Sequence, residues 1–214
     1  MRKSRLLIAL GFSIALGSSS AAAIGIKVNP SAQDVALGNQ VSVALVISGL
    51  TDLGPPALGS FDVDVVFDSA ILSFGSATYG DPSLGDQLDP TGLAGIVSST
   101  TPGVGSVNLF ELSLEDAALL NALQAGQFTL GTLIFNAVGN GSSPLGLRLN
   151  DLADAVGAAL TADATGGAVR VQGPVPVAEP ATLLLLGSGL VGRRAAGAIR
   201  RRLNRVFVSN RVRT

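Results

Sequence analysis

Apolar residues recur at every second position in two segments, and this alternation constrains the fold of the chain more than any other feature. The alternating apolar residues are Val41, Val43, Leu45 and Ile47 in the first segment and Phe61, Val63, Val65 and Phe67 in the second. A period of two gives a β-strand one apolar face, whereas an amphipathic helix needs a period near 3.6. Both segments are therefore predicted to be half-buried strands.

Seven further segments carry strand-forming residues between clusters of Gly, Pro, Asp and Asn that favour turns. They are residues 24–28, 71–77, 95–99, 107–112, 127–138, 145–149 and 168–172. About nine short strands predict an all-β chain that folds as a jelly-roll β-sandwich. The six phenylalanines of this body, at positions 61, 67, 74, 110, 128 and 135, all fall in strand patterns and are expected in the core.

One segment between the predicted strands has helical features. Residues 117–123 are good helix formers, and Ser113 is suited to cap them, with Asp116 at the capping-box offset. Gly126 is suited to end the helix. We expect one short helix that crosses between two strands.

The chain contains neither histidine nor cysteine. Ser-His-Asp and Cys-His catalysis, disulfides, and ordinary zinc or copper sites are therefore excluded. Asp62 and Asp64 lie on one strand face, but a glycosidase needs two acids beside a sugar-binding cleft, and Tyr79 is the only tyrosine in a chain without tryptophan. We expect a protein that is not an enzyme, with a carboxylate-dependent glycosidase as the less favoured alternative.

Two loops offer the hard oxygen ligands that calcium prefers. They contain Asp81, Asp86 and Asp89 in one case and Asn150, Asp151 and Asp154 in the other. Neither loop has EF-hand spacing, and Asp and Asn beside Gly and Pro are also typical of turns. No cofactor is therefore predicted, and calcium at either loop is the alternative.

The first 23 residues have the three parts of a secretory signal peptide. A start with three basic residues precedes the apolar residues 6–17, which are too short to span a bilayer. Small residues follow, and the ending at Ala21 and Ala23 suits cleavage by signal peptidase before Ile24. We expect an N-terminal signal helix and export, with an uncleaved N-terminal anchor as the alternative.

Charge divides the chain into three zones. Of the 14 basic residues, three lie in the predicted signal peptide and eight lie between Arg193 and Arg213. Residues 24–172 therefore hold three basic residues and 14 acidic ones, a net charge of −11. Nucleic-acid binding requires the opposite sign and is excluded.

Three runs in the body resemble the cohesin-like modules of bacterial extracellular proteins. They are GNQVSV at 38–43, GSFDVDVVFDSAIL at 59–72 and GTLIF at 131–135. The shared features are a strand that ends in an aromatic-Asp turn and a later Gly-x-Leu-x-Phe strand before a Gly-rich turn. The resemblance covers about residues 24–171 and implies a nine-stranded jelly-roll sandwich that binds a partner. True cohesins hold dockerin modules through a sheet face.

The C-terminal segment resembles the PEP-CTERM sorting signal of Gram-negative bacteria that secrete exopolysaccharide. It begins Glu179-Pro180-Ala181-Thr182, continues as an apolar run to Gly192, and is followed by Arg193, Arg194, Arg200, Arg201 and Arg202. The resemblance implies processing by a membrane exosortase near Glu179-Pro180. Pro180 disfavours helix at Glu179, so the pair is expected to be extended and accessible. The arginines resist translocation and keep the tail inside.

The uncharged run of 12 residues, 181–192, rises about 18 Å as a helix, against about 30 Å of hydrocarbon. Extension through the two arginines at 193 and 194 to residue 199 gives 19 residues, or about 28 Å. A plain stop-transfer anchor or an interfacial helix is the alternative. The expected domains are a signal peptide (1–23), the sandwich (24–172), a linker (173–178), the sorting signal with its membrane helix (179–205) and a basic cytoplasmic tail (206–214).

Together these features predict a non-catalytic protein of the cell surface or extracellular matrix of a Gram-negative bacterium. We expect export, transient anchoring in the inner membrane, and association with exopolysaccharide or biofilm. The expected partners are signal peptidase and exosortase, the membrane through the C-terminal helix, and an extracellular protein or polysaccharide. The alternative is a module for a dockerin-like partner, which should carry a contiguous apolar patch on one exposed sheet face.

Overall fold

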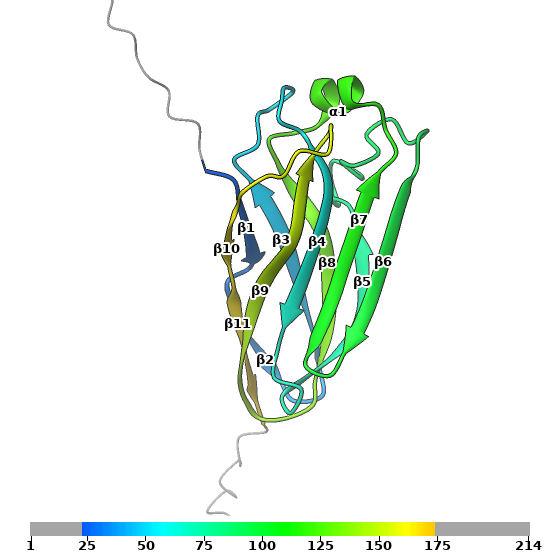
Figure 1. Cartoon of the computed structure of the whole chain (residues 1–214). Helices are drawn as coiled ribbons and strands as arrows, with labels where there is room; N and C mark the ends of the chain where they lie inside the picture. Colours follow the sequence, from blue (N-terminus) through cyan, green and yellow to red (C-terminus); the bar gives the residue numbers. More distant parts are fainter. Residues whose placement is uncertain (1–22, 174–214) are drawn as a thin grey trace, which may run out of the picture. The chain divides into compact units, whose positions relative to one another are not determined.

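The computed structural model describes residues 23–173, which form two β-sheets packed face to face (Figure 1). The five-stranded sheet has the order β10 (Asp163–Thr165), β1 (Gly25–Asn29), β3 (Gln40–Ser48), β8 (Gln127–Ala137), β5 (Leu72–Tyr79). The six-stranded sheet has the order β2 (Ala32–Ala36), β11 (Gly167–Gln172), β9 (Gly141–Asp154), β4 (Leu58–Val66), β7 (Ser106–Ser113), β6 (Ile96–Gly103). The predicted all-β sandwich is confirmed.

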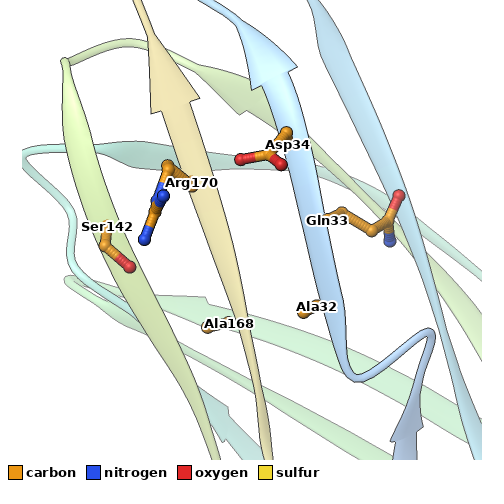
Figure 2. Close-up of a pocket in the computed structure, with 6 residues that line it drawn as sticks. All are labelled: Ala32, Gln33, Asp34, Ser142, Ala168 and Arg170. Carbon is orange, nitrogen blue, oxygen red and sulfur yellow. The ribbon is translucent and has the colours of Figure 1, made fainter.

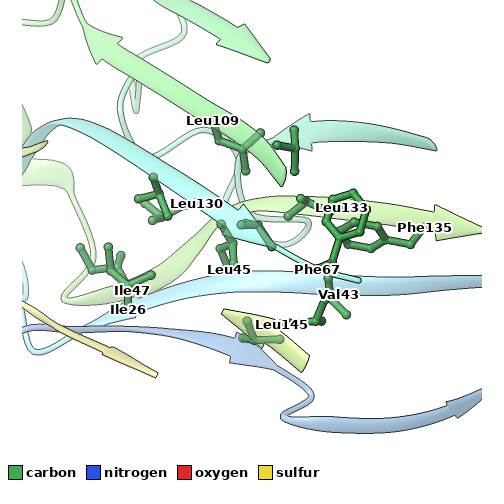
Figure 3. Packing of buried hydrophobic residues seen from close by; sticks show 14 of the residues in the cluster. Ile26, Val43, Leu45, Ile47, Phe67, Leu109, Leu130, Leu133, Phe135 and Leu145 are labelled. Carbon is green, nitrogen blue, oxygen red and sulfur yellow. The ribbon is translucent and has the colours of Figure 1, made fainter. Parts of the chain in front are cut away.

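The two segments with clear alternation supply the centre of the core. Val43, Leu45 and Ile47 of β3 and Phe61, Val63 and Val65 of β4 are each 1% exposed or less. Figure 3 shows several of these residues packed with side chains of other strands, including Leu133 and Phe135 of β8. The rings of Phe67 and Phe135 meet edge to face with centroids 5.0 Å apart. The apolar residues that alternate in the sequence are therefore the ones buried between the two sheets.

The structure has eleven strands where the sequence predicted about nine. The two missed strands, β2 and β10, are five and three residues long and lie at sheet edges. Each pairs with one parallel neighbour, and no residue of either strand is fully buried. Segments this short and this exposed have no readable alternation, so their pairing was not visible in the sequence.

The short helix α1 (Ala117–Leu123) connects β7 in one sheet to β8 in the other, as predicted. Its ends differ from the prediction. Asp116 is the N-cap, because its carboxylate accepts the backbone N–H of Ala118 at 2.8 Å. Ser113 lies one turn too early and accepts the N–H of Glu115 instead. The helix ends at Gln124 before it reaches Gly126.

Within residues 23–173, no helix is long and apolar enough to cross a membrane. Nearly all of the predicted signal peptide, most of the linker, and the whole of the predicted sorting signal and basic tail lie outside the described residues. The membrane helix and the two processing sites therefore stay predictions.

Candidate functional site

A network of side-chain hydrogen bonds lies on the outer face of the six-stranded sheet. Its centre is Asn108 of β7, whose Nδ2 donates to Oδ1 of Asp62 at 2.5 Å and to Oδ1 of Asp64 at 2.9 Å. From the other side, Nδ2 of Asn150 in β9 donates to Oδ1 of Asp62 at 3.0 Å. The network joins three neighbouring strands and fixes the positions of the two carboxylates of β4.

Strand register places the members of this network side by side. On β4, Asp64 lies opposite Asn108 of β7 and Arg148 of β9, and Asp62 lies opposite Asp151 of β9. Asp62 and Asp64 are both partly exposed, whereas their neighbours along the strand, Phe61, Val63 and Val65, are buried. The prediction that these two acids share one strand face is confirmed.

A bulge in β9 brings Asn150 into the network. The register of β4 and β9 shifts between Asp62 and Val63, and across this step the partner on β9 changes from Asp151 to Leu149. Asn150 is the extra residue, and both it and Asp151 are exposed. Without the bulge, strict alternation would turn one of these two side chains inward.

Apolar side chains lie beside this network on β6 and β7. Val97 of β6 lies opposite Leu112 of β7, and these side chains are 49% and 39% exposed. Phe110, two residues before Leu112 on the same strand, is partly exposed and lies opposite Asp62. A dockerin-binding module was expected to show an apolar patch on one sheet face, and these three side chains are neighbours on one. We call the outer surface formed by Asp62, Asp64, Val97, Asn108, Phe110, Leu112 and Asn150 the β4–β7 face.

The prediction that all six phenylalanines of the body pack in the core is wrong for Phe110. Alternation in β7 turns Val107, Leu109 and Glu111 inward, and so turns Phe110 and its neighbours at even positions outward. The other five phenylalanines are buried or pack against the buried cluster. Pairing with β4 sets the register of β7 and so decides which of its residues are buried.

The acids of the first predicted calcium loop accept hydrogen bonds from backbone N–H groups. The donors are Ser83, Leu84 and Thr129 for Asp81, Leu88 for Asp86, and Leu93, Ala94 and Gly95 for Asp89. Burial opposes ionisation of Asp81, but its N–H donors outweigh burial and lower the pKa of this carboxyl below the ordinary value.

The second predicted calcium loop is also arranged as a turn. Asp154 accepts the N–H groups of Val156 and Ala158, while the Asn150 amide is bonded to Asp62. In the part of the chain from residue 23 to residue 173, no three His, Cys, Asp or Glu side chains are grouped to hold a metal ion. Asp154 therefore acts as a turn acceptor here, and calcium at either loop stays an untested alternative.

Four surface hollows of about 260 to 500 Å³ do not bring two acids together. The largest of the four has no carboxylate in its lining, one includes Asp154, and two share Asp34. Figure 2 shows one of the latter, where Asp34 of β2 and Arg170 of β11 lie on neighbouring strands beside Ala32 and Ala168. A glycosidase needs two acids at a defined separation, and none of these four hollows supplies them.

Sequence reasoning did not single out Asn108, Val97 and Leu112 as residues of this candidate face. Asn108 and Glu111 are the two polar residues among the apolar residues of the predicted strand 107–112, and the interruption at Asn108 is the signal that was available. Its position opposite Asp64 depends on the pairing of strands 44 residues apart, which no local pattern encodes.

No protein-family model matches the chain, and no curated protein matches it in sequence. Solved cohesin structures do match its fold. The non-cellulosomal cohesin of the archaeon Archaeoglobus fulgidus is 16% identical, with a TM-score of 0.51 over 71% of this chain and 92% of its own. CaCohA2 of Clostridium acetobutylicum is 21% identical, with a TM-score of 0.53 over 75% of this chain and 99% of its own.

A third similar structure is from the Coh-OlpA–Doc918 complex, a type I cohesin–dockerin complex of Clostridium thermocellum. It is 14% identical, with a TM-score of 0.53 over 71% of this chain and all of its own. These similarities establish a cohesin-like fold for the described residues, as the resemblance in sequence implied. Sequence identities at this level support the shared fold and do not show a shared function.

Proposed function

We propose that the sandwich is a non-catalytic protein-binding module and that the β4–β7 face is its binding surface. The observation that supports this most is the network of Asp62, Asn108 and Asp64 beside apolar side chains. The amides hold one oxygen of each carboxylate, so the second oxygen of each is available to a donor on a partner. The apolar side chains add surface that a partner can bury.

The proposed partner is a dockerin-like protein that presents N–H or O–H donors together with a few apolar side chains. Several of the similar cohesins were solved as complexes with dockerins. The carboxylates favour a donor-rich partner, and the net charge of −11 on residues 24–172 favours one with a positive surface.

We also propose that the module is exported and sorted as its terminal sequences suggest. Signal peptidase would cut after Ala23, and an exosortase would act near Glu179-Pro180 while the apolar run rests in the inner membrane. The processed protein would then belong to the cell surface or to an exopolysaccharide or biofilm matrix. The support for this localisation is the signal peptide, the sorting motif and the distribution of charge in the sequence.

Site-specific photo-cross-linking in the producing cell tests the binding surface. A cross-linking residue replaces Leu112 in the full-length chain, and the matched control replaces Ser42, an exposed residue of β3 in the other sheet. We expect a defined cross-linked protein with a dockerin-like sequence from position 112 and none from position 42. We also expect the substitution Asp62→Ala to weaken binding of the purified partner about tenfold or more, as truncation of a central interface residue does.

The substitution Asp34→Ala is the matched control, because Asp34 is an exposed acid of β2 at the far edge of the same sheet. Equal cross-linking from both positions would contradict the proposed surface. So would equal binding of the Asp62→Ala variant, the Asp34→Ala variant and the unaltered protein.

A further inference from the structure

Glu111 of β7 projects into the interior of the sandwich. Its side chain is 1% exposed, and neither carboxyl oxygen has a hydrogen-bond partner. Its inward-facing neighbours on the strand, Leu109 and Val107, are buried hydrophobic residues. An unpartnered carboxylate is so unfavourable in such surroundings that the group takes up a proton instead.

Two titratable side chains, those of Asp86 and Tyr79, lie near Glu111 on neighbouring elements. Asp86 comes from the segment between β5 and β6, and its Oδ1 accepts the N–H of Leu88 at 2.9 Å. The carboxyl groups of Asp86 and Glu111 are close but do not reach hydrogen-bond geometry. Tyr79, at the end of β5, donates its hydroxyl proton to the Ser99 carbonyl at 2.5 Å rather than to Glu111.

The surroundings of Glu111 and Tyr79 raise the pKa of both side chains. Burial, the charge of Asp86 and its capacity to accept the proton together raise the pKa of Glu111 to about 8. Burial also raises the pKa of Tyr79 above its ordinary value, so the phenol stays neutral over the same range. Among residues 23–173, no cation opposes this rise by lowering the pKa of Glu111.

The segment between β5 and β6, residues 80–95, is attached to the sandwich on both sides of Asp86. At its start, the N–H of Gly80 donates to the Leu130 carbonyl at 3.0 Å, and at its end the Gly95 carbonyl accepts the N–H of Leu114 at 3.2 Å. Between these points, Gln124 of the α1 cap donates to the Gln87 carbonyl at 2.9 Å. Ser113, two residues after Glu111 on β7, donates its hydroxyl to the Leu88 carbonyl, and Leu88 donates its N–H to Asp86, so this part of the segment lies against β7 close to Glu111.

We propose that Glu111 and Asp86 form a proton-dependent contact between β7 and residues 80–95, and that loss of the Glu111 proton loosens this segment. With the proton present, the pair carries one negative charge. Without it, two carboxylates lie close together, that of Glu111 fully buried, with no cation among the described groups around them. Repulsion and desolvation then act together on the segment that carries Asp86.

Because the pKa of Glu111 is raised in the folded chain, this residue makes the folded state less stable as pH rises. Below the ordinary Glu pKa near 4.5, Glu111 is protonated in both the folded and the unfolded chain. Between that value and about 8, the folded chain keeps a proton that the unfolded chain releases, so stability falls as pH rises. Above about 8 the stabilisation from this proton is lost.

The single tyrosine makes the contact directly observable. The chain has no tryptophan, so Tyr79 is its fluorescent reporter, and it lies beside Glu111. We expect its emission, and the hydrogen-exchange protection of residues 80–95 after correction for intrinsic rates, to change with a midpoint near pH 8 in the full-length chain. Millimolar calcium and EDTA are compared throughout.

Three variants test whether the pH transition depends on Glu111 and Asp86. The variant E111Q resembles the protonated acid at every pH, so both signals should stay constant from about pH 5 to about pH 9.5. The variant D86N removes the neighbouring charge, so the transition should move to lower pH. The control D34N makes the same change as D86N at an exposed acid of β2, at the far edge of the six-stranded sheet, and should leave the transition in place.

Signals from the unaltered protein that are flat across this range would overturn the proposal, as would a transition retained in E111Q. A transition that calcium abolishes and EDTA restores would overturn it too, because the pair would then be a cation site. If E111Q does not fold, the unaltered protein and D86N still decide the outcome. A shift of the D86N midpoint upward, or no shift, contradicts the proposed pair.

Discussion

Two buried polar residues of this sandwich, Gln124 and Glu111, differ in whether their side-chain polar atoms have hydrogen-bond partners. The carbonyl oxygen of Gln124 accepts the N–H of Leu58 at 2.6 Å, and its amide donates to the carbonyls of Leu58 and Gln87 at 2.9 Å each. Glu111 is equally buried and has no such partner. The hydrogen bonds of Gln124 stabilise one packing arrangement. Glu111 has no such bonds, so the stability of the fold depends on whether it is protonated.

The substitution Gln124→Ala should therefore be strongly destabilising. It removes the partners of one N–H and two carbonyl groups at a site that is 1% exposed, so we expect a loss of about 4 kcal/mol in the free energy of unfolding. Urea unfolding monitored by circular dichroism measures it. The control Gln40→Ala removes one exposed bond, to Asn136, and should cost less than about 0.5 kcal/mol. Similar losses in the two variants would contradict the assignment.

Alternation predicted burial correctly in β3 and β4 but failed in β7. In β3 and β4 the polar residues fall mostly on one face, so the other face is buried, although Val46 and Ser60 of the more polar face are buried as well. In β7 the even positions Phe110 and Leu112 are as apolar as Leu109, and pairing with β4 decides the outcome by placing Glu111 opposite Phe61. The conflict between local pattern and long-range pairing lies where we locate both the proposed binding face and the proton-dependent pair.

At the scale of elements, two irregularities of β4 and β9 determine the shape of the candidate face. One is the bulge at Asn150, which joins residues 88 positions apart in the chain. The other is the register shift between Leu58 and Ser60, at Gly59. Such irregularities are set by backbone pairing between distant segments, so the sequence predicted the long strands but neither these shifts nor the short edge strands.

The register shift at Gly59 leaves no space for a side chain. A Cβ at this position would lie 2.4 Å from the Asp154 carbonyl oxygen, so Gly59→Ala forces β4 and β9 apart. We expect a loss of about 3 kcal/mol in the free energy of unfolding. Gly25→Ala is the control, since its Cβ would lie 3.6 Å from the Asp163 carbonyl oxygen, an ordinary contact. Urea unfolding compares the two variants, and a Gly59→Ala variant as stable as the control would contradict this steric account.

At the scale of the whole molecule, the described residues begin and end at opposite ends of the sandwich (Figure 1). Ala23 lies beside Gly49 at the end that carries α1, and Gly173 lies beside Asn140 at the other end.

Processing at Glu179-Pro180 is the prediction that belongs to this scale. We expect the protein recovered from the surface of the producing cell to begin near Ile24 and to end near Glu179, as measured by intact mass. Replacement of Glu179-Pro180 by Ala-Ala should leave the C-terminus intact to Thr214 and keep the protein in the membrane fraction, because the extended, accessible pair is lost. Replacement of Val175-Pro176 by Ala-Ala removes a proline from the preceding linker and should leave processing unchanged.

A mature surface protein that still extends to Thr214 would favour a permanent anchor and contradict exosortase processing. This outcome is separable from the proposed binding function. The substitution Asp62→Ala lies on the β4–β7 face, far from Glu179 in sequence, and should weaken partner binding while the protein is still processed and released. A variant at Glu179-Pro180 should show the reverse, with binding retained by a sandwich that stays in the membrane fraction. Loss of both properties in either variant would show that sorting and binding depend on each other.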